Sequence, residues 1–196
     1  MYYYQEITLI PQAELSPYSI WRTLYTQLHL ALVEHQDDQH EVGIGVAFPA
    51  YGFGDNSPTT LGAKLRLFAA TEGELQQLNI AHWLTRLSDY VHLTGIRAVP
   101  ERRITGYSSF YRIQTKSSPE RLARRRAKQG DISYEDALAQ YNHKAQITKL
   151  PYLQLESLSN GHPFRLFIAR KPATGVGTGR FSTYGLSTQA AVPEFV

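Results

Sequence analysis

The first 100 residues combine two residue patterns in an order that few folds accommodate. Polar and apolar residues alternate in a strand, whereas apolar residues recur every three or four positions in a helix. Gln5, Ile7 and Leu9 share one face of the first strand pattern. Residues 71–74, with Thr71 and Glu74 three positions apart, resemble a capping box before the second helical pattern. The order is strand, helix, strand, strand, helix, strand, at 2–10, 18–34, 42–48, 64–69, 71–91 and 95–99.

This βαββαβ order is that of the ferredoxin-like fold, which RNA-recognition modules share with many unrelated proteins. We therefore expect an α+β protein whose residues 1–100 form an N-terminal ferredoxin-like domain. Residues 101–196 are less regular and are expected to form a smaller C-terminal α/β region. Its expected elements are strands at 107–115, 152–157, 164–170 and 181–185, an arginine-rich helix at 119–128 and a short helix from Ser133.

Positive charge is concentrated in one part of the chain. Residues 97–130 contain ten of the twenty Lys and Arg residues but only two of the seventeen acidic residues, which gives a net charge of +8. The remaining residues contain ten bases and fifteen acids, a net charge of −5. This polarisation indicates a polyphosphate partner, because clustered cations gain affinity by releasing the counterions of a nucleic acid.

The densest positive charge falls on the helix at 119–128. Ser118 suits the cap, and Pro119 suits the first helical position, where its missing N–H costs nothing. Four cations then share one face: Arg121, Arg124, Arg125 and Lys128. A phosphate backbone would relieve their repulsion, and such a helix fits the deep groove of an RNA hairpin. The alternative is a solvated helix face, although no acid follows Glu120 until Asp131.

Several other classes of protein find little support in the sequence. The chain has no cysteine, which excludes disulfides and thiolate metal sites. It has no signal-peptide pattern and no run approaching the roughly 20 apolar residues of a membrane span, so we expect a cytoplasmic protein without membrane contact. The histidines form no dense ligand set, and neither a metal nor a cofactor is expected. The run 175–179 is interpreted as a hairpin connection, with contact to RNA backbone as the alternative.

Four motifs along the whole chain resemble one known family. They are Leu28-His29-Leu30-Ala31-Leu32-Val33; Arg112-Ile113-Gln114 with Lys116, Pro119-Glu120-Arg121-Leu122 and Arg124-Arg125; Glu156-Ser157-Leu158-Ser159-Asn160-Gly161 with 164–168; and Phe181-Ser182-Thr183-Tyr184-Gly185-Leu186-Ser187. In this order they resemble the CRISPR RNA-processing endoribonuclease of subtype I-F systems. The family has an N-terminal ferredoxin-like domain and a C-terminal region with an arginine-rich helix, which agrees with the patterns above.

The resemblance implies an activity and a set of partners. Members of the family cut the repeat of a precursor CRISPR RNA at the 3′ base of a stem-loop, without a metal ion. They stay bound to the product and join the other subunits of the type I-F interference complex. A non-catalytic subunit that binds the RNA hairpin is the rival interpretation, and the presence of His29 favours the enzyme. DNA binding would fit the charge, but not the ferredoxin-like framework with one histidine and one serine.

The resemblance also implies roles for individual residues. His29 and Ser157 match the catalytic pair, and Tyr184 matches a tyrosine that steadies the active site. Arg112 and Gln114 match residues that read base pairs at the foot of the stem. The other expected RNA-binding residues are Lys116, Arg121, Arg124, Arg125, Lys128, Ser159 and Phe164, of which Phe164 matches an aromatic that stacks on the terminal pair.

The arginine-rich helix departs from the family pattern near its end. Lys128, Gln129 and Gly130 stand where relatives carry Arg, Arg and His. Ala123 replaces another arginine, whereas Arg126 is an extra one. The hairpin that this chain recognises can therefore differ from those of its relatives.

Metal-free cleavage of RNA requires a base that activates a ribose 2′-hydroxyl. A histidine suits this task because its pKa of about 6.5 lies near working pH. At 100° per residue, His29 lies about 120° from the apolar centre of its helix, on a flank beside Tyr25. Ser157 would hydrogen-bond and orient the hydroxyl without becoming a nucleophile. From the residues alone, an ordinary surface histidine and a serine at a strand end are the alternatives.

Overall fold

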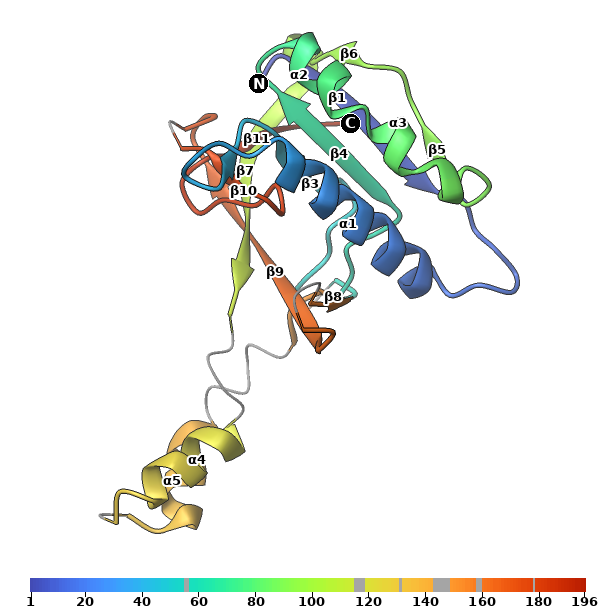
Figure 1. Ribbon diagram of the computed structural model, residues 1–196. Helices are drawn as coiled ribbons and strands as arrows, with labels where there is room; N and C mark the ends of the chain where they lie inside the picture. Colours follow the sequence, from blue (N-terminus) through green and yellow to red (C-terminus); the bar gives the residue numbers. More distant parts are fainter. Residues whose placement is uncertain (55–56, 115–118, 131, 143–148, 158–159, 178) are drawn as a thin grey trace.

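The computed structural model describes residues 1–54, 57–114, 119–130, 132–142, 149–157, 160–177 and 179–196, with the backbone alone for 119–121 and 142. The N-terminal half contains β1 (Tyr3–Leu9), α1 (Pro17–Glu34), β2 (Glu41–Val42), β3 (Gly45–Ala47), β4 (Lys64–Ala69), α2 (Glu72–Leu78), α3 (Ile80–Trp83), η1 (Thr85–Leu87), β5 (Val91–Leu93) and β6 (Arg97–Ala98). The C-terminal half contains η2 (Glu101–Arg103), β7 (Ile104–Ile113), α4 (Pro119–Ala127), α5 (Tyr134–Asn142), β8 (Tyr152–Glu156), β9 (Pro163–Ala173), β10 (Phe181–Ser182) and β11 (Val192–Phe195). Helices and antiparallel sheets are mixed along the chain, which confirms the α+β class (Figure 1).

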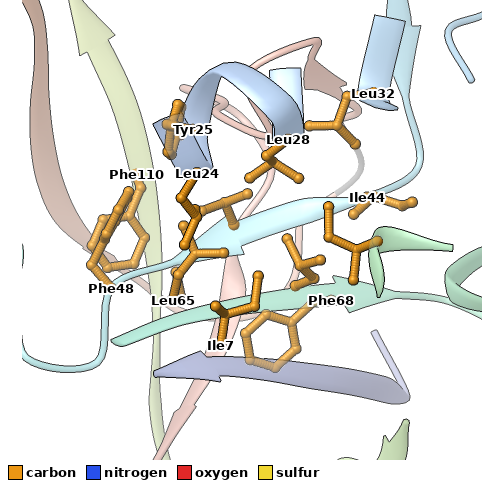
Figure 2. Close-up of a cluster of buried hydrophobic side chains, with 14 of the residues drawn as sticks. Ile7, Leu24, Tyr25, Leu28, Leu32, Ile44, Phe48, Leu65, Phe68 and Phe110 are labelled. Atoms are coloured by element: carbon orange, nitrogen blue, oxygen red, sulfur yellow. The ribbon is translucent and has the colours of Figure 1, made fainter. Parts of the chain in front are cut away.

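The first sheet has the strand order β3-β4-β1-β5, and β6 also pairs with β1. All of these neighbours are antiparallel, and the two central strands are the first and third strands of the expected βαββαβ unit. Helix α1 crosses one face of the sheet. Its Leu24 and Leu28 side chains point toward Ile7 and Leu65 of the sheet (Figure 2), and all four side chains are fully buried. This buried contact fixes α1, and therefore His29, on the sheet.

Three segments of the N-terminal half are shorter than the sequence patterns indicated. Of the strand expected at 95–99, only 97–98 is present, as β6. The strand expected at 42–48 divides into β2 and β3 because its two parts have different partners: Val42 pairs with Phe181 of β10, whereas Gly45 pairs with Phe68 of β4. The helix expected at 71–91 ends at Leu78, since Asn79 adopts the left-handed conformation with φ 43°. The capping box that starts this helix is confirmed.

The second sheet has the strand order β11-β7-β9-β8 and is antiparallel throughout. The sequence patterns missed β11, which is four residues long and contains Pro193. The strand expected at 181–185 shortens to β10, which pairs with β2 of the N-terminal half. Phe110, Leu153 and Phe195 join the same buried cluster as the first sheet. The domain boundary near residue 100 stays a prediction, and the hydrophobic core runs across it.

Helices α4 and α5 form a hairpin that projects from the end of the sheets (Figure 1). Ala123 of α4 and Ala137 of α5 are both fully buried, and such small side chains let two helices approach closely. Ala123 therefore sits in the contact between the two helices. Among the described residues, no helix combines the length and the apolar character needed to cross a bilayer.

Candidate active site

Helix α1 presents His29 from a well-anchored position. Ser16 caps the helix by accepting a hydrogen bond from the Tyr18 backbone N–H, and Pro17 occupies its first turn. The apolar stripe expected from the sequence is buried as a whole: Ile20, Trp21, Leu24, Leu28, Ala31 and Leu32. His29 lies at the border of this stripe and is only partly buried, so its ring reaches the surface while its backbone is held.

The hydrogen-bond partner of His29 determines which nitrogen of its imidazole carries the proton. Its Nδ1 lies 2.8 Å from the carbonyl oxygen of Thr183. A carbonyl oxygen only accepts hydrogen bonds, so Nδ1 carries the proton and Nε2 of the neutral ring keeps its lone pair. Burial lowers the pKa of His29, the hydrogen bond to Thr183 raises it, and the charge of Arg112 lowers it, with a lowered pKa as the result. Both the tautomer and the pKa favour a neutral ring that can accept a proton at Nε2.

Tyr184 lies flat against this imidazole. The two ring centroids are 4.1 Å apart and the ring planes differ by 5°. The turn that carries Tyr184 is fixed on both sides: Gly185 donates to the Ser182 carbonyl at 2.7 Å and accepts from the Val46 N–H at 2.9 Å. Gly185 has φ 69°, and a Cβ atom there would lie 2.2 Å from the Val46 side chain. Only glycine fits this turn without strain, because both the conformation and the space exclude a side chain.

Arg112, near the end of β7, faces the same two residues. Its guanidinium lies 5.6 Å from the ring centre of Tyr184 and 5.4 Å from that of Phe164, distances at which a cation is attracted to an aromatic face. Its Nε is buried and finds no hydrogen-bond partner among the described residues. A buried donor without an acceptor is costly, so this atom is suited to a ligand that supplies one. The structure thus brings together His29, Tyr184, Arg112 and Phe164.

Ser157 follows directly after β8, in a tight turn. Its N–H donates to the His162 carbonyl at 2.9 Å, and its own carbonyl accepts from the Gly161 N–H at 2.7 Å. The residue before it, Glu156, forms an ion pair with Arg22 of α1. Arg22 precedes His29 by two helical turns and lies on the same side of α1. One helix therefore carries His29 and also contacts β8, the strand that ends just before Ser157.

An open groove of about 840 Å³ reaches Tyr184 and Arg112, although neither His29 nor Ser157 is part of its lining. Arg112, Gln114 and Tyr184 line it together with polar side chains of the segment 179–189. Gln114 is exposed at the groove, so its amide is accessible to a ligand. The remaining wall comes from 39–41 and contains Glu41, while Arg180 is paired with Asp37 at 3.1 Å. A polar groove lined by the guanidinium-bearing Arg112 suits a nucleic acid better than an apolar ligand.

The arginine-rich helix exposes part of its expected cationic face. Arg124, Arg125 and Lys128 are exposed, whereas Arg126 is partly buried and donates to the Gln129 side chain at 2.9 Å. Helix α4 ends at Ala127, so Lys128 lies just beyond it, and its N–H still bonds the Arg124 carbonyl. Lys116, Ser118 and Ser159 lie outside the described residues, as does the side chain of Arg121.

Comparison with known families relates the whole chain to one of them. The model of the family described as "CRISPR-associated protein (Cas_Csy4)" matches residues 4–195. The chain belongs to the Cas_Csy4 family. The resemblance seen in its four motifs is thereby confirmed. Two relatives named CRISPR-associated endonuclease Cas6/Csy4 are each 36% identical to it over all of both chains, one from Escherichia coli (strain UTI89 / UPEC), aligned over 202 residues, and one from Pseudomonas aeruginosa (strain UCBPP-PA14), aligned over 197 residues.

In this member of the Cas_Csy4 family, several contacts at the site had no sequence prediction. The hydroxyl of Tyr25 donates to the Tyr184 carbonyl at 2.9 Å, and the Thr183 carbonyl fixes the His29 ring. Helical spacing places Arg22 and Tyr25 on the side of α1 that carries His29, which is a usable signal. Their partners lie at least 130 residues away in the sequence, and no local pattern identifies them.

Proposed function

We propose that this member of the Cas_Csy4 family is a metal-independent endoribonuclease that cuts a CRISPR repeat RNA at the 3′ base of its stem-loop. Its membership of the family and the printed name of both relatives, CRISPR-associated endonuclease, support the reaction class. The observation that supports a histidine base is the hydrogen bond from Nδ1 of His29 to the Thr183 carbonyl, because it leaves Nε2 as the basic atom.

In the proposed reaction, Nε2 of His29 takes the proton of a ribose 2′-hydroxyl. The freed oxygen attacks the adjacent phosphorus and forms a new P–O bond, while the bond from phosphorus to the 5′-oxygen breaks. The leaving 5′-oxygen takes up a proton from water. The products are a 2′,3′-cyclic phosphate and a 5′-hydroxyl, and no electrons are exchanged with another reagent. A neutral histidine supplies the base, so the step requires no metal-bound hydroxide.

Two further residues have supporting roles in this proposal. Ser157 hydrogen-bonds the 2′-hydroxyl and turns it toward phosphorus, which is an effect of orientation and not of covalent catalysis. Tyr184 holds the imidazole plane by stacking on it. The turn around Ser157 and the turn around Tyr184 are both closed by short backbone hydrogen bonds, which supports a fixed geometry.

The RNA stem would be held in the groove that Arg112 and Gln114 line. Arg112 and Gln114 line the groove and would read bases at the foot of the stem, where Phe164 would stack on the terminal pair. Arg124 and Arg125, exposed on α4, would contact phosphates of the stem. Lys116, Arg121, Lys128 and Ser159 complete the expected RNA contacts and stay predictions.

The same contacts would retain the cut hairpin, because none of them depends on the nucleotides beyond the cleavage site. Retention of the product and assembly with other subunits of a type I-F interference complex follow from the family resemblance and stay predictions. A subunit that binds the hairpin without cutting it is the second candidate. The exposed arginines of α4 favour it, because they would serve RNA binding without any catalytic base. The presence of His29 with Nε2 available argues for the enzyme.

The test incubates the purified protein with its cognate repeat RNA in EDTA. We expect cleavage at one position, with a cyclic phosphate on the upstream fragment. His29→Ala should abolish cleavage while hairpin binding persists, and His82→Ala, which changes an exposed histidine of α3, should cut normally. Unchanged cutting by His29→Ala would remove His29 from its role. Loss of cutting in EDTA that Mg²⁺ restores would indicate metal-dependent chemistry, and binding without cutting by the unaltered protein would favour the scaffold.

A further inference from the structure

Tyr25 lies one helical turn before His29 and has no role in the reaction described above. Its side chain is fully buried and packs against Phe48. The two rings are stacked, with centroids 6.2 Å apart and planes that differ by 17°. A phenylalanine would fill this apolar space equally well. What the hydroxyl adds is the hydrogen bond of 2.9 Å that it donates to the Tyr184 carbonyl.

This bond has a counterpart one turn further along α1. His29 binds the carbonyl of Thr183 at 2.8 Å, and Tyr25 binds the carbonyl of the next residue, Tyr184. Residues four apart in a helix lie one above the other, so α1 holds two consecutive peptide groups of the turn. The peptide between Tyr184 and Gly185 is held at two points: its carbonyl accepts from the Tyr25 hydroxyl, and its N–H donates to the Ser182 carbonyl at 2.7 Å. Two such bonds fix the direction of a peptide, whereas a single one lets it turn about the bond axis. The direction of the Tyr184 backbone in turn sets where its ring lies.

The hydroxyl of Tyr25 acts as a donor at any working pH. Burial, and then the neighbouring Tyr184, raise the pKa of Tyr25, so the hydroxyl keeps its proton. The Tyr184 carbonyl would lose its side-chain partner without this hydroxyl. Only the bond from the Gly185 N–H to the Ser182 carbonyl would then hold this peptide. The peptide would tilt about that bond until water reached the Tyr184 carbonyl, which would move the Tyr184 ring off the imidazole.

We infer that Tyr25 is a positioning residue for the proposed cleavage reaction, which holds the ring of Tyr184 parallel to His29 by binding the Tyr184 carbonyl. The inference rests on the proposed function for its effect on cleavage. Its effect on His29 itself rests on geometry alone. Within the part of the chain that the structure describes, Tyr184 and Arg112 are the titratable and charged groups that face the imidazole, and both lie on elements other than α1.

The test replaces the hydroxyl and nothing else, in the full-length Tyr25→Phe protein. Tyr51→Phe is the matched control, because the Tyr51 hydroxyl also donates to a backbone carbonyl, that of Ile168, at 3.0 Å. Ile168 lies within β9, which β7 and β8 hold on both sides, so its peptide should keep its direction. At saturating protein, we expect the single-turnover cleavage rate of Tyr25→Phe to fall by about tenfold, since small misplacements at a reacting centre are costly. The affinity for the hairpin should be unchanged, and Tyr51→Phe should match the unaltered protein in both.

A second readout does not need RNA. The imidazole signals of His29 are titrated by NMR in the free protein, the Tyr25→Phe variant and the Tyr51→Phe variant. Because burial lowers the pKa of His29, loosening of the Tyr184 ring should raise that pKa in Tyr25→Phe only. An unmoved His29 titration together with a normal cleavage rate in Tyr25→Phe would overturn the inference. Absence of cleavage by the unaltered protein would instead overturn the proposed function, and the titration would still decide the role of Tyr25.

Discussion

The imidazole of His29 and the phenol of Tyr184 are parallel to within 5°, with their centroids 4.1 Å apart. These residues come from the first helix and from a turn 155 positions later in the chain. The stacking covers one face of the imidazole, and the bond to Thr183 fixes its edge. Little freedom remains for the ring except to present Nε2 to a ligand, which is the feature on which the proposed reaction depends.

The first prediction concerns pH. Burial lowers the pKa of His29, so the neutral ring persists to lower pH than in an unfolded chain. A general base acts when unprotonated, so kcat/KM should rise with pH through a midpoint that lies below the ordinary histidine value of about 6.5. The measurement is cleavage at subsaturating RNA across pH 4.5–8.5, a range of about four units around that value. A rate that falls as pH rises through this range would contradict a histidine base.

The second prediction separates the ring of Tyr184 from its hydroxyl. Tyr184→Phe keeps the ring that covers His29, and its pH profile should match that of the unaltered protein. Tyr184→Ala removes the cover, so the pKa of His29 should rise toward its ordinary value and the cleavage profile should shift to higher pH. Identical profiles for the two variants would mean that stacking does not control the ionisation of His29.

The third prediction concerns Arg112. Arg112→Lys keeps the charge but loses the planar group that lies between Phe164 and Tyr184. Discrimination between the natural hairpin and one whose last base pair is inverted should fall by about 1–3 kcal/mol. Arg165→Lys is a matched control, since its guanidinium also lies over a ring, that of Tyr152, at 4.8 Å. Equal discrimination by both variants would place base reading elsewhere.

The fourth prediction concerns α4. Changing Arg124 and Arg125 together to Ala should reduce the slope of log affinity against log salt by about one to two units, if both meet phosphates. Arg126→Ala changes the same residue type on the same helix, but its side chain already bonds Gln129. It should leave the slope nearly unaltered. A slope that is the same in all three proteins would place the exposed arginines off the RNA.

The fifth prediction concerns the turn beside the site. Gly185→Ala should destabilise the protein in two ways, by its φ of 69° and by a clash with Val46. Gly130→Ala isolates the first cost, because Gly130 has φ 82° and no heavy atom within 4 Å of the added carbon. We expect Gly130→Ala to lower the free energy of unfolding by about 1 kcal/mol, and Gly185→Ala to lower it by about 1–3 kcal/mol more. Urea unfolding of both variants measures the difference. Equal costs would contradict the close approach to Val46.

Patterns that act over a few residues were predicted well. The apolar stripe of α1, the capping box at Thr71 and the alternation in β1 follow from local periodicity, and all three are confirmed. The helix break at Asn79 was missed because an asparagine tolerates both helical and left-handed conformations. The division of 42–48 was missed because β10, which takes Val42 as its partner, lies far away in the sequence.

The site shows the same limit. Helical spacing placed His29 on a flank of α1, and the family resemblance selected it together with Tyr184 and Arg112. The bonds that make the imidazole useful are to backbone carbonyls of the turn at 183–184, which carry no side-chain signature. The ion pair between Arg22 and Glu156 likewise joins two exposed charges that nothing in the local sequence connects.

The most direct test of the account is a crystal structure of the protein bound to its repeat RNA with a single 2′-deoxyribose at the cleavage site, which prevents the cut. The account predicts that the stem lies along α4 and that Nε2 of His29 comes within hydrogen-bond reach, about 2.6–3.2 Å, of the position of the missing 2′-oxygen. A stem bound on another surface, with His29 far from the ribose before the cleaved phosphate, would contradict it.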